Sequence, residues 1–300
     1  MPLRPGLLRH IISNKMNNLK LAVQKNGRLS EKSLELLKAC GIRLSNGDRK
    51  LRATSSNFPL EVLFLRDDDI PQYVEQGVAD IGILGENEVW EKARKVDTLD
   101  KLGFAACRLS LAIPKEETYT GPAYFSGKKV ATSYPRILQH FFKQQQVIAE
   151  IEEIGGSVEI APGIGLAQGI FDIVSTGSTL MMNGLKEVET VMQSEAVIIA
   201  CPAMQPGPLA ILEQLRFRID AVRKAAENKY ILLNAPDTAL EKITAIIPGM
   251  KSPTILPLAK EGWSSIHSVV SEDVFWEVIG QLKNAGAEGI LVIPIEKMIR

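Results

Sequence analysis

A loop rich in hydroxyl groups is the strongest chemical signal in the sequence. Asp172-Ile173-Val174 reads as the end of a buried strand, and Ser175-Thr176-Gly177-Ser178-Thr179 follows it directly. Backbone N–H groups after a strand end can converge on an anion, Gly177 removes a side chain that would block them, and the hydroxyls add donors without adding charge. A hydroxyl-rich turn has the same composition. The segment therefore predicts either a phosphate-binding loop or an ordinary turn.

Motifs for other kinds of nucleotide or nucleophile chemistry are missing. The glycines of residues 163–169 do not have the G-x-G-x-x-G spacing of dinucleotide-binding proteins, and no Walker A sequence occurs. None of the three histidines stands in a motif that would orient a Ser-His-Asp or Cys-His set. The three cysteines are widely spaced among apolar neighbours, which fits reduced thiols and gives no zinc pattern.

Composition excludes two further classes of protein. Lysine plus arginine and aspartate plus glutamate each number 35, with no concentrated basic stripe, so we expect no nucleic-acid partner. No apolar run approaches the roughly 20 residues that cross a bilayer, so we expect a cytoplasmic protein with no membrane partner. Residues 1–18 only faintly imitate a targeting peptide and are expected to form an N-terminal extension.

The elements that must position the loop alternate between strands and helices from Leu19 to Ala200, which predicts an α/β fold. Pro- and Gly-rich stretches at residues 114–127 and 201–208 predict two crossings between two lobes. We expect lobe I to comprise residues 19–113 and 201–224, and lobe II to comprise residues 114–200.

The last part of the chain, residues 225–300, has a different order of elements. Its strand and helix patterns follow as βαββαβ, the order of a ferredoxin-like module. The two helices of such a module cover one face of the sheet and leave the other free for a partner. We therefore expect a separate C-terminal domain.

Eight stretches, taken together and in order, resemble the long form of the ATP phosphoribosyltransferase family, which opens histidine biosynthesis. They span about residue 19 to residue 300 and are 24–30 (QKNGRLS), 66–71 (RDDDIP), 80–87 (DIGILGEN), 107–112 (CRLSLA), 131–135 (ATSYP), 156–159 (GSVE), 172–180 (DIVSTGSTL) and 252–255 (SPTI). The resemblance implies a two-lobed, periplasmic-binding-protein-like catalytic part with a C-terminal ferredoxin-like regulatory domain.

The resemblance also implies a reaction. Adenine N1 of ATP would attack the anomeric carbon of phosphoribosyl pyrophosphate, and pyrophosphate would leave without a covalent enzyme intermediate. Catalysis would rest on alignment and on neutralising the pyrophosphate. Mg²⁺ would reach the site on substrate phosphates, so we expect no protein metal cage.

Site residues follow from the resemblance and from local chemistry. For catalysis we expect Arg28, Glu159 and Asp172, with Glu159 near the ribose hydroxyls. For substrate binding we expect Lys25, Gly27, Arg66, Gly85, Arg108, Ser175, Thr176, Gly177, Ser178 and Thr179. Arg66 and Arg108 could instead pair with nearby carboxylates, and Asp69 is expected to cap a helix. Tyr134 could pack or stack on a base.

Regulation and assembly are implied by the resemblance alone. Histidine would inhibit the enzyme from a site around Asn234, Met250, Thr254, Val270 and Gly289, and the chain would form a hexamer, with a dimer as the alternative. Thr254 could equally be an ordinary strand residue.

Two alternative functions remain open from the sequence. A two-lobed binding or regulatory protein without catalysis would hold a small anion in the same fold, because fold alone does not decide function. A sensor with its only ligand in the C-terminal domain would leave the motifs of the two lobes unexplained.

Overall fold

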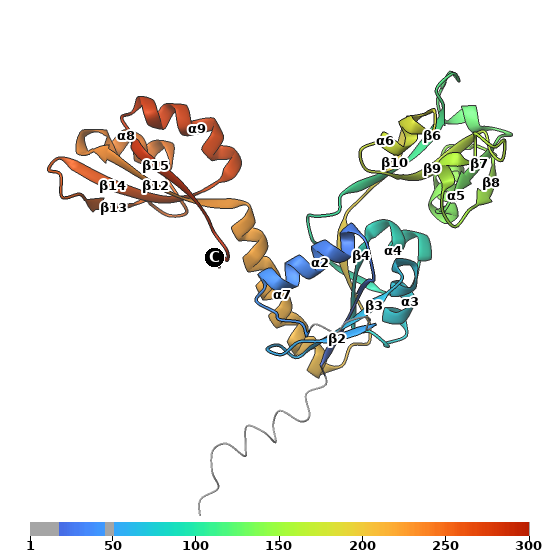
Figure 1. The fold of residues 1–300 in the computed structure, drawn as a ribbon, viewed down its shortest axis with the longest axis horizontal. Coiled ribbons are helices and arrows are strands. Elements are labelled where there is room, and N and C mark those ends of the chain that lie inside the picture. Colours follow the sequence, from blue (N-terminus) through green and yellow to red (C-terminus); the bar gives the residue numbers. More distant parts are fainter. Residues whose placement is uncertain (1–17, 46–50, 300) are drawn as a thin grey trace, which may run out of the picture. The chain divides into compact units, whose positions relative to one another are not determined.

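The computed structural model describes residues 18–45 and 51–299, so residues 1–17 of the expected N-terminal extension lie outside it. The described chain divides into two compact units. The first takes the residues up to 212 apart from Leu36–Gly41, and the second takes those remaining residues and the chain from Glu213 onward. The first unit contains two α/β lobes, and the second contains the C-terminal domain (Figure 1).

Lobe I is built on a sheet of six strands. Their order is β2 (Arg52–Thr54), β3 (Leu60–Leu65), β1 (Leu19–Gln24), β4 (Ile81–Gly85), β11 (Ala196–Ala200) and β5 (Asp97–Lys101). The central strands are nearly continuous apolar runs because both of their faces are covered. The helical elements of this lobe are α2 (Arg28–Ala39), η1 (Asp67–Asp69), α3 (Ile70–Glu75) and α4 (Glu86–Lys92). Strand β1 pairs in parallel with β3 and β4, so the carboxyl ends of all three lie at one edge.

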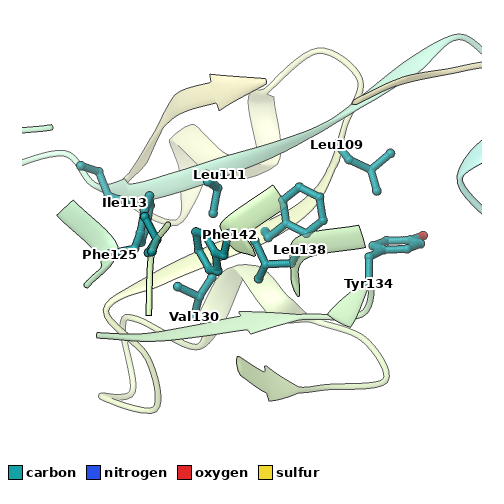
Figure 2. Packing of buried hydrophobic residues seen from close by; sticks show 10 residues of the cluster. Leu109, Leu111, Ile113, Phe125, Val130, Tyr134, Leu138 and Phe142 are labelled. Carbon is teal, nitrogen blue, oxygen red and sulfur yellow. The ribbon is translucent and has the colours of Figure 1, made fainter. Parts of the chain in front are cut away.

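Lobe II is built on a sheet of five strands with a buried core on each face. Their order is β10 (Leu185–Ser194), β6 (Cys107–Pro114), β9 (Gly169–Val174), β7 (Lys129–Thr132) and β8 (Glu150–Glu153). Figure 2 shows the core that includes Leu138 and Phe142 of α5 (Pro135–Gln144). The other core includes Val158 of η3 (Val158–Ile160) and Leu180 of α6 (Ser178–Met182). A short η2 (Pro122–Phe125) precedes β7.

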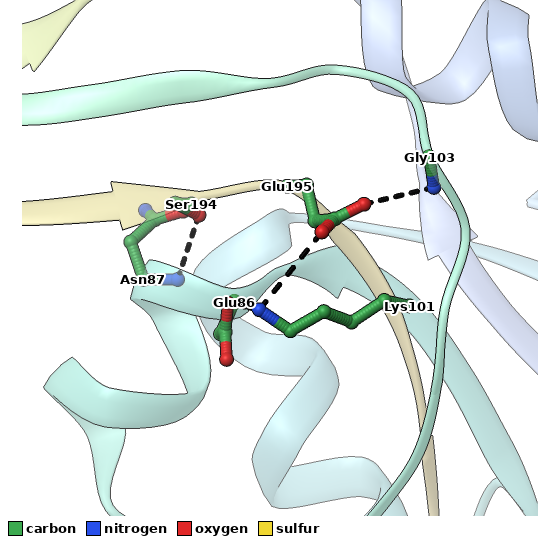
Figure 3. Close-up of polar contacts among 6 residues, drawn as sticks. All are labelled: Glu86, Asn87, Lys101, Gly103, Ser194 and Glu195. Atoms are coloured by element: carbon green, nitrogen blue, oxygen red, sulfur yellow. Dashed lines mark hydrogen bonds and ion pairs between the residues drawn. The ribbon is translucent and has the colours of Figure 1, made fainter.

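The two crossings between the lobes lie earlier than the Pro- and Gly-rich stretches that predicted them. Strand β6 belongs to the sheet of lobe II, and β11 belongs to the sheet of lobe I. Each crossing is therefore one strand away from the expected boundaries at 113/114 and 200/201. Figure 3 shows the crossings side by side, where the N–H of Gly103 donates to the carboxylate of Glu195 at 2.9 Å. Hydrogen bonding between strands, which local composition does not reveal, decides sheet membership.

The C-terminal domain has the expected βαββαβ order. Its elements are β12 (Asn228–Pro236), η4 (Asp237–Ala239), α8 (Leu240–Ile246), β13 (Thr254–Pro257), β14 (Trp263–Ser271), α9 (Glu272–Asn284) and β15 (Glu288–Pro294). The sheet is antiparallel, in the order β13-β14-β12-β15. The long helix α7 (Pro206–Ala226) leads into it along the chain. The ferredoxin-like prediction is therefore confirmed.

The expected parallel arrangement holds for only part of each catalytic sheet. Strands β7, β8 and β9 pair in parallel, whereas β4 pairs antiparallel with β11 and β6 pairs antiparallel with β9 and β10. These antiparallel pairs arise where the chain passes from one lobe to the other. Within the described part of the chain, no helix is long and apolar enough to span a membrane.

Candidate functional site

The loops after β1 and β3 lie together at the carboxyl edge of the lobe I sheet. The N–H of Lys25 donates to the carbonyl of Leu65 at 2.8 Å, and Gln24 Nε2 donates to Asp67 at 3.3 Å. Gly27 has a φ of +95°, a left-handed conformation that glycine adopts at no steric cost and that turns the chain into α2. Ligands of open α/β sheets bind outside such strand ends.

Two exposed cations stand on these loops. Lys25 and Arg28 are exposed, and neither side chain pairs with another described residue. Arg66 is different, because its guanidinium pairs with Asp68 at 3.2 Å, although the side chain is 79% exposed. The alternative that Arg66 pairs with a neighbouring carboxylate is therefore the arrangement in this structure. Asp69 stands before α3 but makes no capping hydrogen bond, so the expectation that it caps the helix is wrong.

The loop after β4 contributes a group that the sequence did not single out. Gly85 precedes α4, and a Cβ on it would collide with Asn87 Oδ1. The residue after Asn87, Glu88, is 6% exposed and accepts a hydrogen bond from Asn87 Nδ2 at 3.1 Å. Burial and the nearby carboxylates of Asp67 and Asp68 raise the pKa of Glu88 to about 7, against the opposing effects of Lys92 and Tyr134. A buried carboxyl amid like charges is typical of functional sites.

The hydroxyl-rich loop follows β9 in lobe II, as expected, and turns into α6. Gly177 has a φ of +79° at the position that precedes the helix. The four hydroxyl residues of the loop are exposed, namely Ser175, Thr176, Ser178 and Thr179. Leu180, which follows them, is buried and packs in the core of lobe II. Among the described residues, the N–H groups of Ser175, Thr176, Gly177 and Thr179 have no acceptor. The loop therefore offers unpaired donors at an exposed strand end, which favours the anion site over a self-satisfied turn.

Arg108 lies beside this loop, but its charge is paired. Its guanidinium forms a two-pronged ion pair with Glu187 of β10 and donates to the carbonyl of Ser175 at 3.1 Å. The ion pair lowers the pKa of Glu187. Arg108 thus holds the start of the loop in place in this structure. Its expected role as a substrate-binding cation stays a prediction.

Asp172 of β9 and Glu159 of η3 lie close enough for the charge of Glu159 to act on Asp172. Burial is the main cause that raises the pKa of Asp172 to about 6, the charge of Glu159 raises it further, and the N–H of Ile173 opposes both. That N–H donates to Asp172 Oδ1 at 2.8 Å. The two carboxyl groups can accept hydrogen bonds from sugar hydroxyls, and a cation beside them would relieve their repulsion.

Tyr134 belongs to lobe II and lies close to carboxylates of lobe I. Its ring packs in the core of lobe II, and Figure 2 shows its hydroxyl directed away from the other labelled side chains. Burial, followed by the nearby charges of Glu88, Asp172 and Asp67, raises the pKa of Tyr134, so its hydroxyl lies close to carboxylates of lobe I. The ring therefore packs, and its hydroxyl stands where carboxylates of both lobes converge. Asp80 immediately precedes β4, the strand that ends at Gly85. Its Oδ2 atom accepts a hydrogen bond from the N–H of Lys20 at 2.7 Å, which is a contact within the lobe I sheet.

A hollow of about 1890 Å³ lies elsewhere in the first unit. It is bounded by α4 and β5 of lobe I and by α5, β8 and β10 of lobe II. None of the predicted site residues lines it. Converging polar groups, rather than empty volume, identify the candidate site at Glu88, Tyr134 and Asp172.

In the C-terminal domain, the predicted effector residues divide between the two faces of the sheet. Asn234 lies on the face away from the helices, because side chains alternate along a strand and its neighbours Leu233 and Ala235 pack in the core. Thr254 lies on the same face, because it pairs with His267, the neighbour of the core residue Ile266. Gly289 has a φ of +56° and its Cα lies beside Asn234, whose Nδ2 is 3.4 Å from where a Cβ would stand. Val270 packs in the core under the helices, and Met250 is exposed.

Comparison with known proteins adds independent findings. A family model described as ATP phosphoribosyltransferase matches residues 66–221, and one described as HisG, C-terminal domain, matches residues 225–297. An ATP phosphoribosyltransferase of Cytophaga hutchinsonii is 57% identical over 282 residues, which are 94% of this chain and 99% of that protein. One of Bacteroides thetaiotaomicron is 58% identical over 281 residues, with the same coverage.

A solved structure also matches this chain. It is an ATP phosphoribosyl transferase (HisG:HisZ) complex from Thermotoga maritima, 29% identical, with a TM-score of 0.58. The match covers 67% of this chain and 98% of that one. The resemblance carried by the sequence motifs is therefore confirmed by family models, by relatives and by a solved fold.

Proposed function

This chain belongs to the ATP phosphoribosyltransferase family, and from that membership we propose how its residues divide the reaction. The enzyme is a glycosyltransferase that catalyses the first step of histidine biosynthesis, the transfer of the phosphoribosyl group to ATP. The N1–C1′ bond forms as the C1′–O bond to pyrophosphate breaks, and the bonding electrons leave with pyrophosphate. The alternatives without catalysis lose their support, since relatives with more than half of the residues identical are transferases.

The hydroxyl-rich loop binds the 5-phosphate of phosphoribosyl pyrophosphate. The observation that carries this assignment is the set of N–H groups of Ser175, Thr176, Gly177 and Thr179, which are unpaired among the described residues around the left-handed Gly177. Each neutral donor that meets a phosphate oxygen forms a hydrogen bond to a charged group, worth about 1.5 to 3 kcal/mol. Asp172 and Glu159 lie at the base of the loop, where the ribose hydroxyls follow the phosphate.

ATP and the leaving pyrophosphate lie against the loops of lobe I. Lys25 and Arg28 are unpaired with described residues, and Gly27 allows the backbone between them to approach a ligand closely. To bind a phosphate, Arg66 must break its ion pair with Asp68. Arg108 keeps its ion pair with Glu187 and positions the start of the hydroxyl-rich loop. Gly85 is the residue before α4. Glu88 of the same helix lies close to Tyr134 of lobe II.

Mg²⁺ fits the donor set at the base of the loop. Asp172 and Glu159 repel each other, and they offer at most a partial oxygen shell, which suits a cation that keeps its substrate ligands. When bound, the ion neutralises charge on the pyrophosphate oxygens. The protein's own residues hold the sugar and the loop.

We assign regulation to the second unit. We infer that histidine binds near Asn234, Thr254 and Gly289, where polar groups lie on the open face of the sheet and a left-handed glycine exposes backbone. Met250 is exposed for contact, and Val270 can contribute only from within the core. The hexamer, the dimer alternative and the cytoplasmic location stay predictions.

Product formation tests the whole proposal. Purified protein is mixed with ATP, Mg²⁺ and phosphoribosyl pyrophosphate, and the ultraviolet absorbance of the N1-substituted adenine is followed with and without histidine. We expect a new adduct that needs both substrates and forms more slowly with histidine. An adduct that forms at the same rate at saturating histidine would contradict the proposed regulation and leave the transferase assignment intact.

A further inference from the structure

Helix α5 of lobe II is capped by a side chain from lobe I. The N–H of Arg136 donates to Glu91 Oε1 and the N–H of Ile137 donates to Glu91 Oε2, each at 3.0 Å. Glu91 belongs to α4, on the other side of both crossings. A single carboxylate thus accepts two backbone donors across the lobe boundary.

Lobe II does not supply this cap itself. The first N–H groups of a helix have no partner within the helix, and a Ser, Thr, Asp or Asn before the helix normally accepts one of them. Here Tyr134 precedes α5 and makes no capping hydrogen bond, and Pro135 has no N–H. The next two donors are those that Glu91 accepts, where the helix dipole also favours a negative charge. Turning the lobes apart would leave both donors without their acceptor.

A second carboxyl group lies one turn earlier on the same face of α4. Glu88 and Glu91 are three residues apart, a spacing that places side chains side by side on a helix. The charge of Glu88 raises the pKa of Tyr134, the residue immediately before α5, so the two side chains lie close together. The carboxyl groups of Glu88 and Glu91 therefore both lie near residues 134–137 of lobe II.

Helix α4 is also fixed at the crossings. Ser194, the last residue of β10, donates to Asn87 Oδ1 at 2.8 Å and accepts the N–H of Asn87 at 3.1 Å (Figure 3). The N–H of Glu86 donates to the carbonyl of Glu195 at 2.9 Å. One end of α4 thus holds the point where the lobes are joined, and its other end reaches α5.

We propose that Glu91 is a positioning residue that fixes the orientation of the two lobes required for phosphoribosyl transfer. The proposal rests on the proposed function, in which lobe II holds the 5-phosphate and ribose of the donor and lobe I holds ATP and the leaving pyrophosphate. Because reacting atoms must be aligned to within about 1 Å, a small rotation between the lobes slows the chemical step without removing any group that touches a substrate.

The test compares Glu91→Gln with Glu75→Gln. The first substitution keeps the shape of the side chain but replaces one acceptor oxygen with an NH₂ group that faces a backbone N–H. Glu75 is a matched control, because it accepts the N–H of Lys95 at 2.9 Å and pairs with Arg94 entirely within lobe I. Amide hydrogen exchange at Arg136 and Ile137, kcat, the KM for each substrate and the melting temperature are measured on the full chain.

For Glu91→Gln we expect faster exchange at those two amides and a kcat lowered by about tenfold or more. The KM for phosphoribosyl pyrophosphate should change less than about twofold, since the loop that binds its 5-phosphate lies within lobe II and is not altered. The melting temperature should fall no more than that of Glu75→Gln, whose kcat should stay near that of the unaltered enzyme. A kcat equal to that of Glu75→Gln would overturn the proposal.

The unaltered enzyme gives a second test that needs no variant. We expect the amides of Arg136 and Ile137 to be protected both without ligands and during turnover with both substrates. Loss of that protection during turnover would also overturn the proposal. If Thr179→Val leaves the kinetics unchanged while Glu91→Gln lowers kcat, the loop assignment fails and the positioning role stands.

Discussion

Thr179 offers the plainest test of the phosphate loop at the scale of one atom. Its hydroxyl is exposed and makes no hydrogen bond to another described residue. Thr179→Val removes that donor and keeps the shape of the side chain. We expect a higher KM for phosphoribosyl pyrophosphate and a kcat/KM lowered by the equivalent of about 1.5 to 3 kcal/mol, the value of one hydrogen bond to a charged group.

A matched control for this change is Thr54→Val. Thr54 is also exposed and ends the short strand β2 of lobe I. We expect Thr54→Val to leave the KM for phosphoribosyl pyrophosphate and kcat/KM unchanged in steady-state assays, because it removes a hydroxyl far along the chain from the loop. Equal kinetics for Thr179→Val and the unaltered enzyme would remove the loop from the substrate site.

The raised pKa of Glu88 predicts that the free energy of unfolding depends on pH. Its pKa of about 7 in the folded protein exceeds the ordinary 4.5, so the folded state binds more protons than the unfolded state between these values. The free energy of unfolding therefore falls as pH rises from about 5 to above 7, by about 2 to 3 kcal/mol. Glu88→Gln should lose this dependence and be at least as stable as the unaltered chain at about pH 8. Denaturant unfolding at several pH values measures the difference, and parallel curves would contradict the assignment.

The sequence identified one half of the site more readily than the other. Residues 172–179 are contiguous, so their types and order reveal a strand end followed by a hydroxyl-rich loop. Glu88, Tyr134 and Asp172 come together only through the packing of the two lobes. Glu88 follows directly after the quoted stretch 80–87, and its charge after an apolar strand was the only local signal.

At the scale of elements, the turn from β9 into α6 depends on Gly177. An alanine at a φ of +79° costs about 1 to 2 kcal/mol and shifts the backbone N–H groups on either side. We expect Gly177→Ala to raise the KM for phosphoribosyl pyrophosphate. Gly41→Ala is the control, because that glycine has a φ of +73° and nothing within 4 Å of a Cβ. Both variants should lose similar stability in thermal melts, and only the first should lose affinity; equal kinetics would assign Gly177 to folding alone.

Strands with continuous apolar runs are the easiest to recognise in the sequence, and polar edge elements are the hardest. Ala196–Ala200 gives a clear strand signal because five apolar residues in a row require burial on both faces. Strand β10 carries charged residues, lies at the edge of its sheet, and has two register shifts against β6. Those shifts break the alternation that reveals a strand. Helix α4 is short and begins after Gly85 without a side-chain cap.

At the scale of the whole molecule, lobe boundaries illustrate what a sequence does not contain. Proline and glycine mark turns wherever they occur, including those of residues 114–127, which lie within lobe II. The true crossings are short stretches around Gly103 and Glu195, which ordinary extended residues can form. Only hydrogen bonding between distant strands assigns β6 and β11 to their sheets.

Removal of the C-terminal domain tests the proposed regulation. A chain that ends at Glu227 lacks the whole four-stranded sheet. We expect its reaction to be insensitive to histidine, because the effector site is lost. Thr254→Val in the full chain keeps the fold of an exposed edge strand and should raise the histidine concentration needed for half-inhibition. Inhibition that persists in the shortened chain would place histidine between the substrate loops instead.

The most direct measurement of the central claim is amide hydrogen exchange of residues 175–179 with phosphoribosyl pyrophosphate and Mg²⁺. The N–H groups of Thr176, Gly177 and Thr179 are without acceptors in the described chain, so they should exchange quickly alone and slowly when phosphate oxygens accept from them. We predict strong protection of these three amides at saturating donor substrate. Rapid exchange there while the enzyme turns over would contradict the account, because the sugar phosphate would have to bind elsewhere.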